Sequence, residues 1–181
     1  MKKIIAAAAL ALAGLTLAAP THAVAPDTAQ AAHARAASAQ SIATGLFLIS
    51  NLADDTPGSA LSIGPVPPVY PPLDVPVRYL SGPLTNHWLV QRGDDGLYTI
   101  SAGRGGPADY RLVERDGAVF ASATQEPSRW MIQGTEDGGL TLGTPDGRLA
   151  TLHADDVPQV TLDAPDGSPA QAWRLMQLSG D

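Results

Sequence analysis

The sequence has no cysteine in its 181 residues. Disulfide bonds are therefore excluded, and so is lipid attachment through a cysteine thioether. A domain of this size without cross-links must be held together by the burial of a hydrophobic core. Lysine is nearly absent as well, because Lys2 and Lys3 are the only two.

The N-terminal segment has the layout of a secretory signal peptide. Lys2 and Lys3 precede an apolar run, rich in Ala and Leu, from Ile4 to Ala19. The run is too short and too rich in Ala to favour a permanent membrane span. We predict cleavage after Ala23, so that residues 1–23 are removed and the protein is secreted to an extracellular or periplasmic location.

Basic residues are few in the mature chain. Nine remain after signal removal, all of them arginine, against 18 acidic residues, for a formal net charge of −9. Nucleic acid is therefore a poor candidate partner, because phosphate binding needs a basic surface. An anionic membrane is disfavoured after signal cleavage for the same reason.

Catalytic motifs are also missing. The sequence contains no Gly-x-Ser-x-Gly, no His-Glu-x-x-His and no phosphate-binding glycine loop. The stretch "HADD" (His153 to Asp156) has a metal-like composition, but a single histidine beside aspartates in a turn is usually a solvated loop. We therefore expect no enzymatic activity, no metal and no cofactor.

What the sequence does contain is an internal repeat. The stretches "HWLVQ", "RWMIQ" and "AWRLM" carry its three tryptophans, Trp88, Trp130 and Trp173, which are 42 and 43 residues apart. The stretches "GLFLIS", "GLYTIS" and "GLTLGT" recur in step with them and begin at Gly45, Gly96 and Gly139. Such a period indicates three structural units.

Within each unit the apolar residues alternate with small or polar ones. This period of two, as in "RLVER" and "AVFAS", is typical of half-buried strands. Five Asp-Gly pairs, at 95–96, 116–117, 137–138, 146–147 and 166–167, provide tight turns between them. We predict an all-β domain over residues 43–181, with about twelve strands, preceded by a flexible Ala-rich leader over residues 24–42.

Three four-stranded units of about 42 residues, each ending in a strand that begins with Trp, resemble a β-trefoil. The resemblance implies that Trp88, Trp130 and Trp173 are core residues. We expect a monomer.

The first unit carries an insertion. Gly45 and Trp88 are 43 residues apart, whereas the corresponding residues of the other two units are 34 apart. The surplus lies in the proline-rich stretch between "ALSI" (60–63) and "VRYL" (77–80). Long loops on a rigid frame are usually functional or disordered, and proline opposes disorder by fixing φ. We expect an exposed, extended loop.

The order "GLFLIS", "LSI", proline-rich loop, "HWLVQ", "GLYTIS", "YRLVERDGAVFAS" and "RWMIQ" is similar to that of cospin-type β-trefoil serine protease inhibitors of fungi and bacteria. The resemblance covers about Thr44 to Leu178. It implies inhibition of an extracellular serine protease through the loop between the second and third strands, which maps to Gly64–Val75. The expected contact residues are Val69, Tyr70, Pro72, Leu73 and Asp74.

A proline directly after the bond that faces the nucleophile would block attack. Leu73, which Asp74 follows, is therefore the first candidate and suits a subtilisin- or chymotrypsin-like pocket. Val69 is the second candidate and suits an elastase-like pocket. Arg104, in the glycine-rich stretch "AGRGGPAD", is a possible second contact, although a solvated arginine in a turn is the simpler interpretation.

One alternative is a carbohydrate-binding trefoil. "QAW" (Gln171 to Trp173) matches the Gln-x-Trp mark of ricin-type lectins, but the other units have "NHW" and "SRW" at this position. No sugar platform of an aromatic residue with an aspartate stands out in the sequence.

Overall fold

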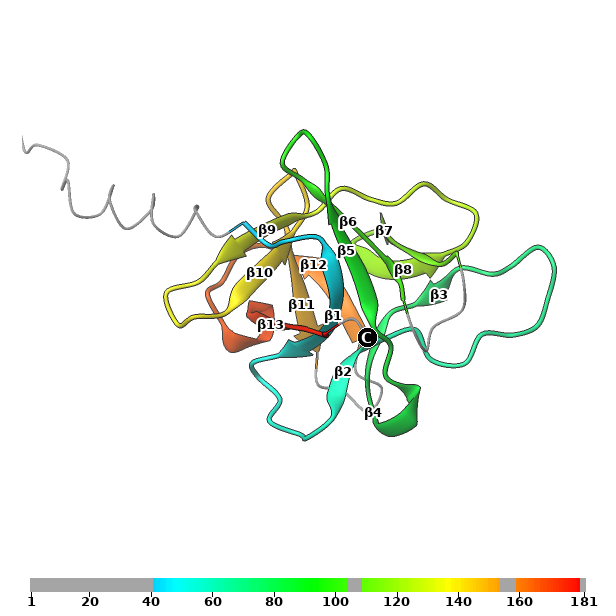
Figure 1. Cartoon of the computed structure of the whole chain (residues 1–181), viewed down its shortest axis with the longest axis horizontal. Helices are drawn as coiled ribbons and strands as arrows, with labels where there is room; N and C mark the ends of the chain where they lie inside the picture. Colours follow the sequence, from blue (N-terminus) through cyan, green and yellow to red (C-terminus); the bar gives the residue numbers. More distant parts are fainter. Residues whose placement is uncertain (1–40, 104–108, 154–158, 180–181) are drawn as a thin grey trace, which may run out of the picture.

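The chain folds into short β-strands joined by turns (Figure 1) in the computed structural model, which describes residues 41–103, 109–153 and 159–179. Unit one contains β1 (Gly45–Asn51), β2 (Ser59–Ser62), β3 (Val75–Pro76), β4 (Arg78–Ser81), the 3-10 turn η1 (Gly82–Leu84) and β5 (Trp88–Arg92). Unit two contains β6 (Tyr98–Ala102), β7 (Arg111–Arg115), β8 (Ala118–Ser122) and β9 (Met131–Gly134). Unit three contains β10 (Leu140–Gly143), β11 (Leu149–His153), β12 (Gln159–Asp163), the 3-10 turn η2 (Pro169–Gln171) and β13 (Trp173–Gln177).

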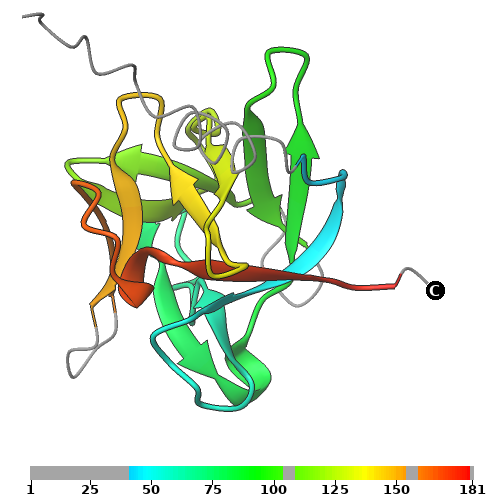
Figure 2. The ribbon, with the colours of Figure 1, turned by 90° about the vertical axis from the view of Figure 1, so that its left-hand side faces the viewer.

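The first and last strands of the three units form a closed ring. Antiparallel pairs join β1 to β5, β5 to β6, β9 to β10, β10 to β13 and β13 back to β1. A bridge between Tyr98 and Trp130 links β6 to the segment that leads into β9. Figure 2 shows the red β13 running beside the cyan β1 where the ring closes.

Apart from β3, which pairs with β8, the remaining strands form one hairpin in each unit. These are β2 with β4, β7 with β8, and β11 with β12. The hairpins contact one another where β12 pairs with both β4 and β8. Each of the three units thus contributes two strands to the six-stranded ring and one hairpin that closes it. This arrangement is a β-trefoil, and the predicted fold is confirmed.

The three tryptophans lie in the core, as predicted. Trp88, Trp130 and Trp173 are at most 1% exposed and belong to one cluster with the apolar residues of the strands. The indole N–H of Trp88 donates to the Leu61 carbonyl at 2.7 Å, and that of Trp173 donates to the Ala150 carbonyl at 2.9 Å. The indole N–H of Trp130 is buried without a partner in the described part of the chain. The interior is therefore symmetric in shape but not in hydrogen bonding.

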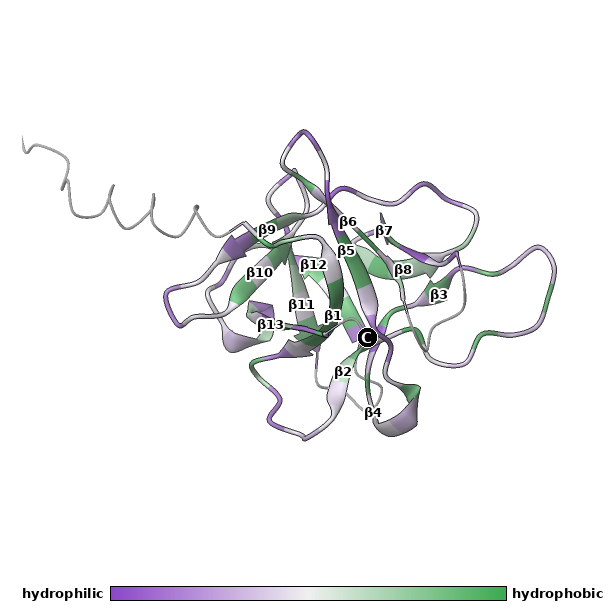
Figure 3. Cartoon of the chain, in the orientation of Figure 1, coloured by the Kyte–Doolittle hydropathy of each residue, from purple (hydrophilic) through white to green (hydrophobic). Residues whose placement is uncertain are grey.

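Hydrophobic residues follow the strands and hydrophilic residues follow the turns (Figure 3). The β7–β8 hairpin turns through Asp116 and Gly117, whose φ angles are 52° and 76°. Two successive residues in the left-handed region are typical of a type I′ turn. The other four Asp-Gly pairs also place their glycine at positive φ, so all five predicted turns carry the backbone conformation that glycine favours.

Residues 41–103, 109–153 and 159–179 contain no helix that is long and apolar enough to cross a bilayer. These residues also contain no group of three or more potential metal ligands. The predicted signal peptide and most of the leader lie outside the described ranges.

Candidate functional site

The proline-rich loop connects β2 to β3 and projects from one end of the domain, at the right of Figure 1. Its tip is exposed: Tyr70 is 96% accessible to solvent, Val69 is 48% accessible and Leu73 is 51% accessible. Pro72 is half-buried. Five large apolar side chains are exposed in the described residues, and three of them lie on this loop. The loop therefore offers an apolar surface to solvent.

The exit of the loop is fixed to unit two by backbone pairing. Val75 and Pro76 form β3 and lie opposite Ala121 and Phe120 of β8. The amide of Val77 then donates to the carbonyl of Val119 at 3.0 Å. The side chains of Val75 and Val77 are buried in the core. The sequence did not predict this strand, because a two-residue ladder with one proline has no recognisable period.

Asp74 holds the same end of the loop through its side chain. Its Oδ2 accepts hydrogen bonds from Arg115 Nη1 and from Gln125 Nε2, each at 2.6 Å. The guanidinium of Arg115 also lies 4.2 Å above the ring of Phe120. The Asp74 side chain is only 15% exposed, and its Oδ1 is buried without a partner in the described structure. The loop is therefore attached to a rigid frame at its C-terminal end.

The tip of the loop is bent. The amide of Val69 donates to the Pro67 carbonyl at 2.9 Å, which closes a three-residue turn around Pro68. The peptide bond between Tyr70 and Pro71 is cis. The three-residue turn interrupts the expected continuous extended strand. No strand among the described residues pairs with this part of the loop, where proline has no amide hydrogen to donate.

The two candidate contact residues differ in how their backbone is used. The carbonyl of Leu73 accepts a hydrogen bond from the Tyr110 hydroxyl at 3.2 Å, and Tyr110 is buried. Val69 and Tyr70 lie at the tip, where no hydrogen bond engages their carbonyls within the described structure. The backbone at Leu73 is therefore directed to the domain, while the backbone carbonyls at Val69 and Tyr70 are available to a partner.

The sequence candidates outside the loop lie only partly within the described residues. Arg104 lies outside the described residues, as do residues 154–156 of the "HADD" stretch. His153 ends β11, and its Nε2 lies 3.0 Å from Oδ2 of Asp163. Hydrogen bonds from Thr161 and His153 lower the pKa of Asp163, against a smaller opposing effect of burial. This pair is an interaction between the neighbouring strands β11 and β12.

Gln171, the residue of the Gln-x-Trp mark, is 2% exposed and fully engaged by the domain itself. Its Nε2 donates to the Thr151 hydroxyl and to the Ala164 carbonyl. Its Oε1 accepts from the Asp166 amide at 2.9 Å. The match to the lectin motif therefore reflects a structural role.

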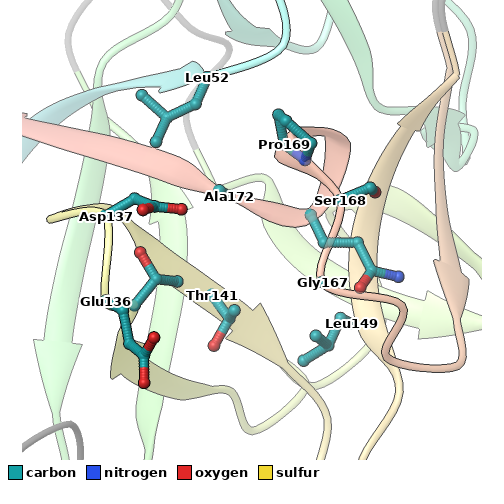
Figure 4. A pocket seen from close by; sticks show the side chains of 11 residues that line it. Leu52, Glu136, Asp137, Thr141, Leu149, Gly167, Ser168, Pro169 and Ala172 are labelled. Atoms are coloured by element: carbon teal, nitrogen blue, oxygen red, sulfur yellow. The ribbon is translucent and has the colours of Figure 1, made fainter.

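A pocket of about 460 Å³ opens in unit three, where the β9–β10 turn faces η2 (Figure 4). Its lining combines aliphatic with polar and acidic residues and contains no aromatic residue: Leu52, Thr135, Glu136, Asp137, Thr141, Leu149, Gly167, Ser168, Pro169, Gln171 and Ala172. In Figure 4 the carboxylate of Asp137 is directed toward Ala172 across the pocket. The sequence predicted no such pocket. The β9–β10 turn, whose residues line it, lies at the opposite end of the view in Figure 1 from the proline-rich loop.

Comparison with known proteins identifies the fold and does not identify a function. No known family matches the sequence, and no curated protein matches it. Among solved structures, a mosquitocidal holotoxin aligns with a TM-score of 0.63 at 12% identity, over 76% of this chain and 18% of the toxin chain. The designed threefold-symmetric protein ThreeFoil aligns with a TM-score of 0.55 at 20% identity, over 74% of this chain and 99% of that chain.

The cytolethal distending toxin of Haemophilus ducreyi aligns with a TM-score of 0.54 at 13% identity, over 76% of this chain and 86% of that chain. At these identities the likeness shows the fold and no more. The chain also spans less than a fifth of the holotoxin chain. The similarity to a threefold-symmetric design agrees with the β-trefoil that the strand pairing defines.

Proposed function

We propose that this protein is a secreted inhibitor of serine proteases that binds the enzyme cleft with its proline-rich loop. One observation carries the proposal: the loop presents Val69, Tyr70 and Leu73 to solvent while Asp74 and Val75 fix its exit to the barrel. A loop that is both exposed and held at its base loses little freedom when a partner binds it. Such loops on rigid frames are common binding elements.

Proline adds to this preorganisation. Each proline at a compatible position reduces the entropy cost of ordering by roughly 0.4–1 kcal/mol. Since about 1.4 kcal/mol corresponds to a tenfold change in affinity, a few prolines would strengthen binding by one to two orders of magnitude. The expected target is an extracellular serine protease, and the inhibitor would act outside the cell as a monomer, without a cofactor.

We assign the bond that faces the enzyme's nucleophile to Val69–Tyr70, at the tip, because Pro71 directly follows Tyr70 and excludes the next bond. The resemblance to cospin-type inhibitors favours Leu73 as well, but the hydrogen bond from Tyr110 already uses the Leu73 carbonyl. A bond presented to a nucleophile needs a free carbonyl, because the protease must stabilise its oxygen. A valine followed by tyrosine suits an elastase-like pocket best. Pro72 and Asp74 would then shape and anchor the loop.

The experiment is a titration of the purified protein against elastase, subtilisin, chymotrypsin and trypsin. Val69→Gly is expected to weaken inhibition of the sensitive enzyme by at least tenfold, while Leu73→Gly has a smaller effect. Asp94→Asn, on an exposed residue of the turn between β5 and β6, is the matched control. Inhibition that survives Val69→Gly, Tyr70→Gly and Leu73→Gly together would exclude the loop, and no inhibition of any serine protease would exclude the function.

The carbohydrate-binding alternative gains no support from a specific residue. Gln171 is engaged by the domain, and the unit-three pocket offers no aromatic face for a sugar ring. A glycan array on the same preparation remains the direct control for it.

A further inference from the structure

The turn before unit two (residues 93–97) and the turn before unit three (residues 135–139) are copies of each other. In the first, Gly93 N donates to Leu97 O at 2.8 Å and Gly96 N donates to Gly93 O at 3.0 Å. In the second, Thr135 N donates to Gly139 O at 2.9 Å and Gly138 N donates to Thr135 O at 3.2 Å. Asp95 and Asp137 therefore occupy equivalent positions, each directly before the glycine with positive φ.

In unit two a cation from the chain itself covers this turn. Arg129, the residue before Trp130, forms an ion pair with Asp95. Its guanidinium lies so close to Gly93 that a Cβ atom there would collide with it. Burial opposes ionisation of Asp95, but hydrogen bonds from the Leu97 amide and from Arg129 outweigh it and lower the pKa of Asp95.

In unit three the equivalent cation is missing. Ala172, the residue before Trp173, stands where unit two has Arg129. Within the described ranges no cationic group pairs with Asp137, and the pocket of about 460 Å³ opens between Asp137 and Ala172. Unit three thus retains the carboxylate, as Asp137, but has the pocket on the side where unit two places the Arg129 side chain.

The rest of the lining suits the stem of such a side chain. Leu52, Leu149 and Pro169 give the pocket an aliphatic wall, and long basic side chains bury their methylene groups on such surfaces. The volume lies within the range of about 300–1,000 Å³ that is usual for ligand sites. Thr135 stands where unit two has Gly93, so an incoming guanidinium would lie farther from the turn than that of Arg129.

We propose that the unit-three pocket binds an arginine side chain presented by another polypeptide. The guanidinium would donate hydrogen bonds to Asp137, and the aliphatic stem would lie against Leu52 and Pro169. The excess of acidic over basic residues draws cationic partners toward the surface. The pocket is open on one side, which leaves room for the backbone that carries the arginine. This site is independent of the proline-rich loop.

The test is a titration of the ¹⁵N-labelled protein with N-acetyl-arginine methylamide, followed by NMR. Saturable shifts are expected for the amides of residues 135–141 and 167–172, with dissociation constants in the millimolar range that weaken as salt screens the charge. The neutral isostere N-acetyl-citrulline methylamide should bind at least about tenfold more weakly. Free arginine should bind more weakly than the capped compound, because its carboxylate is repelled by Asp137.

Asp137→Asn should reduce the affinity for the capped arginine by about tenfold or more, which corresponds to about 1.4 kcal/mol. Asp94→Asn, in the turn before unit two, should leave it unchanged. The double substitution Thr135→Gly with Ala172→Arg copies the unit-two residues and should abolish binding while protease inhibition is retained. Equal binding of the citrulline compound, preference for free arginine, insensitivity to Asp137→Asn or the absence of localised shifts would each overturn the proposal.

Discussion

Asp74 and Arg115 lie 41 residues apart in the sequence and are joined by an ion pair of 2.6 Å. The pair connects the proline-rich loop of unit one to the β7–β8 hairpin of unit two. Together with the pairing of β3 on β8, it makes the end of the loop part of the barrel. The exposed tip is therefore presented by two units at once.

Breaking this pair should loosen the attachment of the loop and lower the stability of the domain only moderately. Arg115→Met retains an aliphatic side chain near Phe120 but leaves Asp74, which is largely buried, with Gln125 alone. We expect a loss of about 1–2 kcal/mol in the free energy of unfolding, because a partly buried carboxylate loses a charged donor. Urea denaturation measures this loss, and limited proteolysis reports on the loop. Arg129→Met, which breaks the exposed pair with Asp95, should cost less than about 1 kcal/mol. Equal losses for the two variants would contradict the anchoring role of Asp74.

The tryptophans should respond unequally to replacement by phenylalanine. Trp88→Phe removes the indole donor and leaves the buried Leu61 carbonyl without it, whereas Trp130→Phe removes a donor that has no partner among the described residues. Both variants lose similar apolar volume, so the difference isolates the hydrogen bond. We expect Trp88→Phe to be about 1–2 kcal/mol more destabilising than Trp130→Phe in chemical denaturation. The prediction fails if Trp130→Phe is the more destabilising variant.

Gln171 should matter for stability rather than for ligand binding. Gln171→Ala leaves the Asp166 amide and the Ala164 carbonyl without their partner and should cost about 2–3 kcal/mol in the free energy of unfolding. Thermal or urea unfolding checks this. Gln133→Ala, at an exposed glutamine of β9, is the control. A loss of sugar binding with unchanged stability would instead restore the lectin interpretation.

Asp163 should contribute to resistance against acid. Because hydrogen bonds from Thr161 and His153 lower its pKa in the folded state, its contribution is present above the unfolded-state pKa of about 3.9. It is lost as the pH falls below that value through the lower folded-state pKa. The side chain is 45% exposed, so we expect less than about 1 kcal/mol. Asp163→Asn should remove this part of the pH dependence between pH 5 and pH 2, as measured by urea unfolding, and Glu126→Gln should not.

Much of the fold could be predicted because the relevant signals are local and repeated three times. The spacing of Trp88, Trp130 and Trp173 indicated three units, and the Asp-Gly pairs indicated the turns. Strand bounds shifted by only one residue where they were predicted in unit one: "ALSI" (60–63) became β2 at Ser59–Ser62 and "VRYL" (77–80) became β4 at Arg78–Ser81. The exposure of the loop was also expected from its length.

The attachments of the loop could not be predicted, because they join residues that are distant in sequence. Neither the ion pair of Asp74 with Arg115 nor the bond from Tyr110 to the Leu73 carbonyl leaves a periodic signal. The unit-three pocket, by contrast, does leave a signal in the repeats of the sequence. Alignment of "SRW" with "QAW" places Ala172 opposite Arg129, and a missing cation beside a retained Asp137 is visible once the repeats are compared position by position.

The closure of the ring by β1 and β13 has a consequence for how the domain forms. These two strands pair although Phe47 and Gln177 are 130 residues apart, so the contact that completes the barrel is also among the most distant in sequence. Contacts of such long range make folding slow. Until residues 173–177 reach it, β1 has an unpaired edge and the core lacks Trp173, so a chain emerging in order from its N-terminus stays open until its last strand arrives.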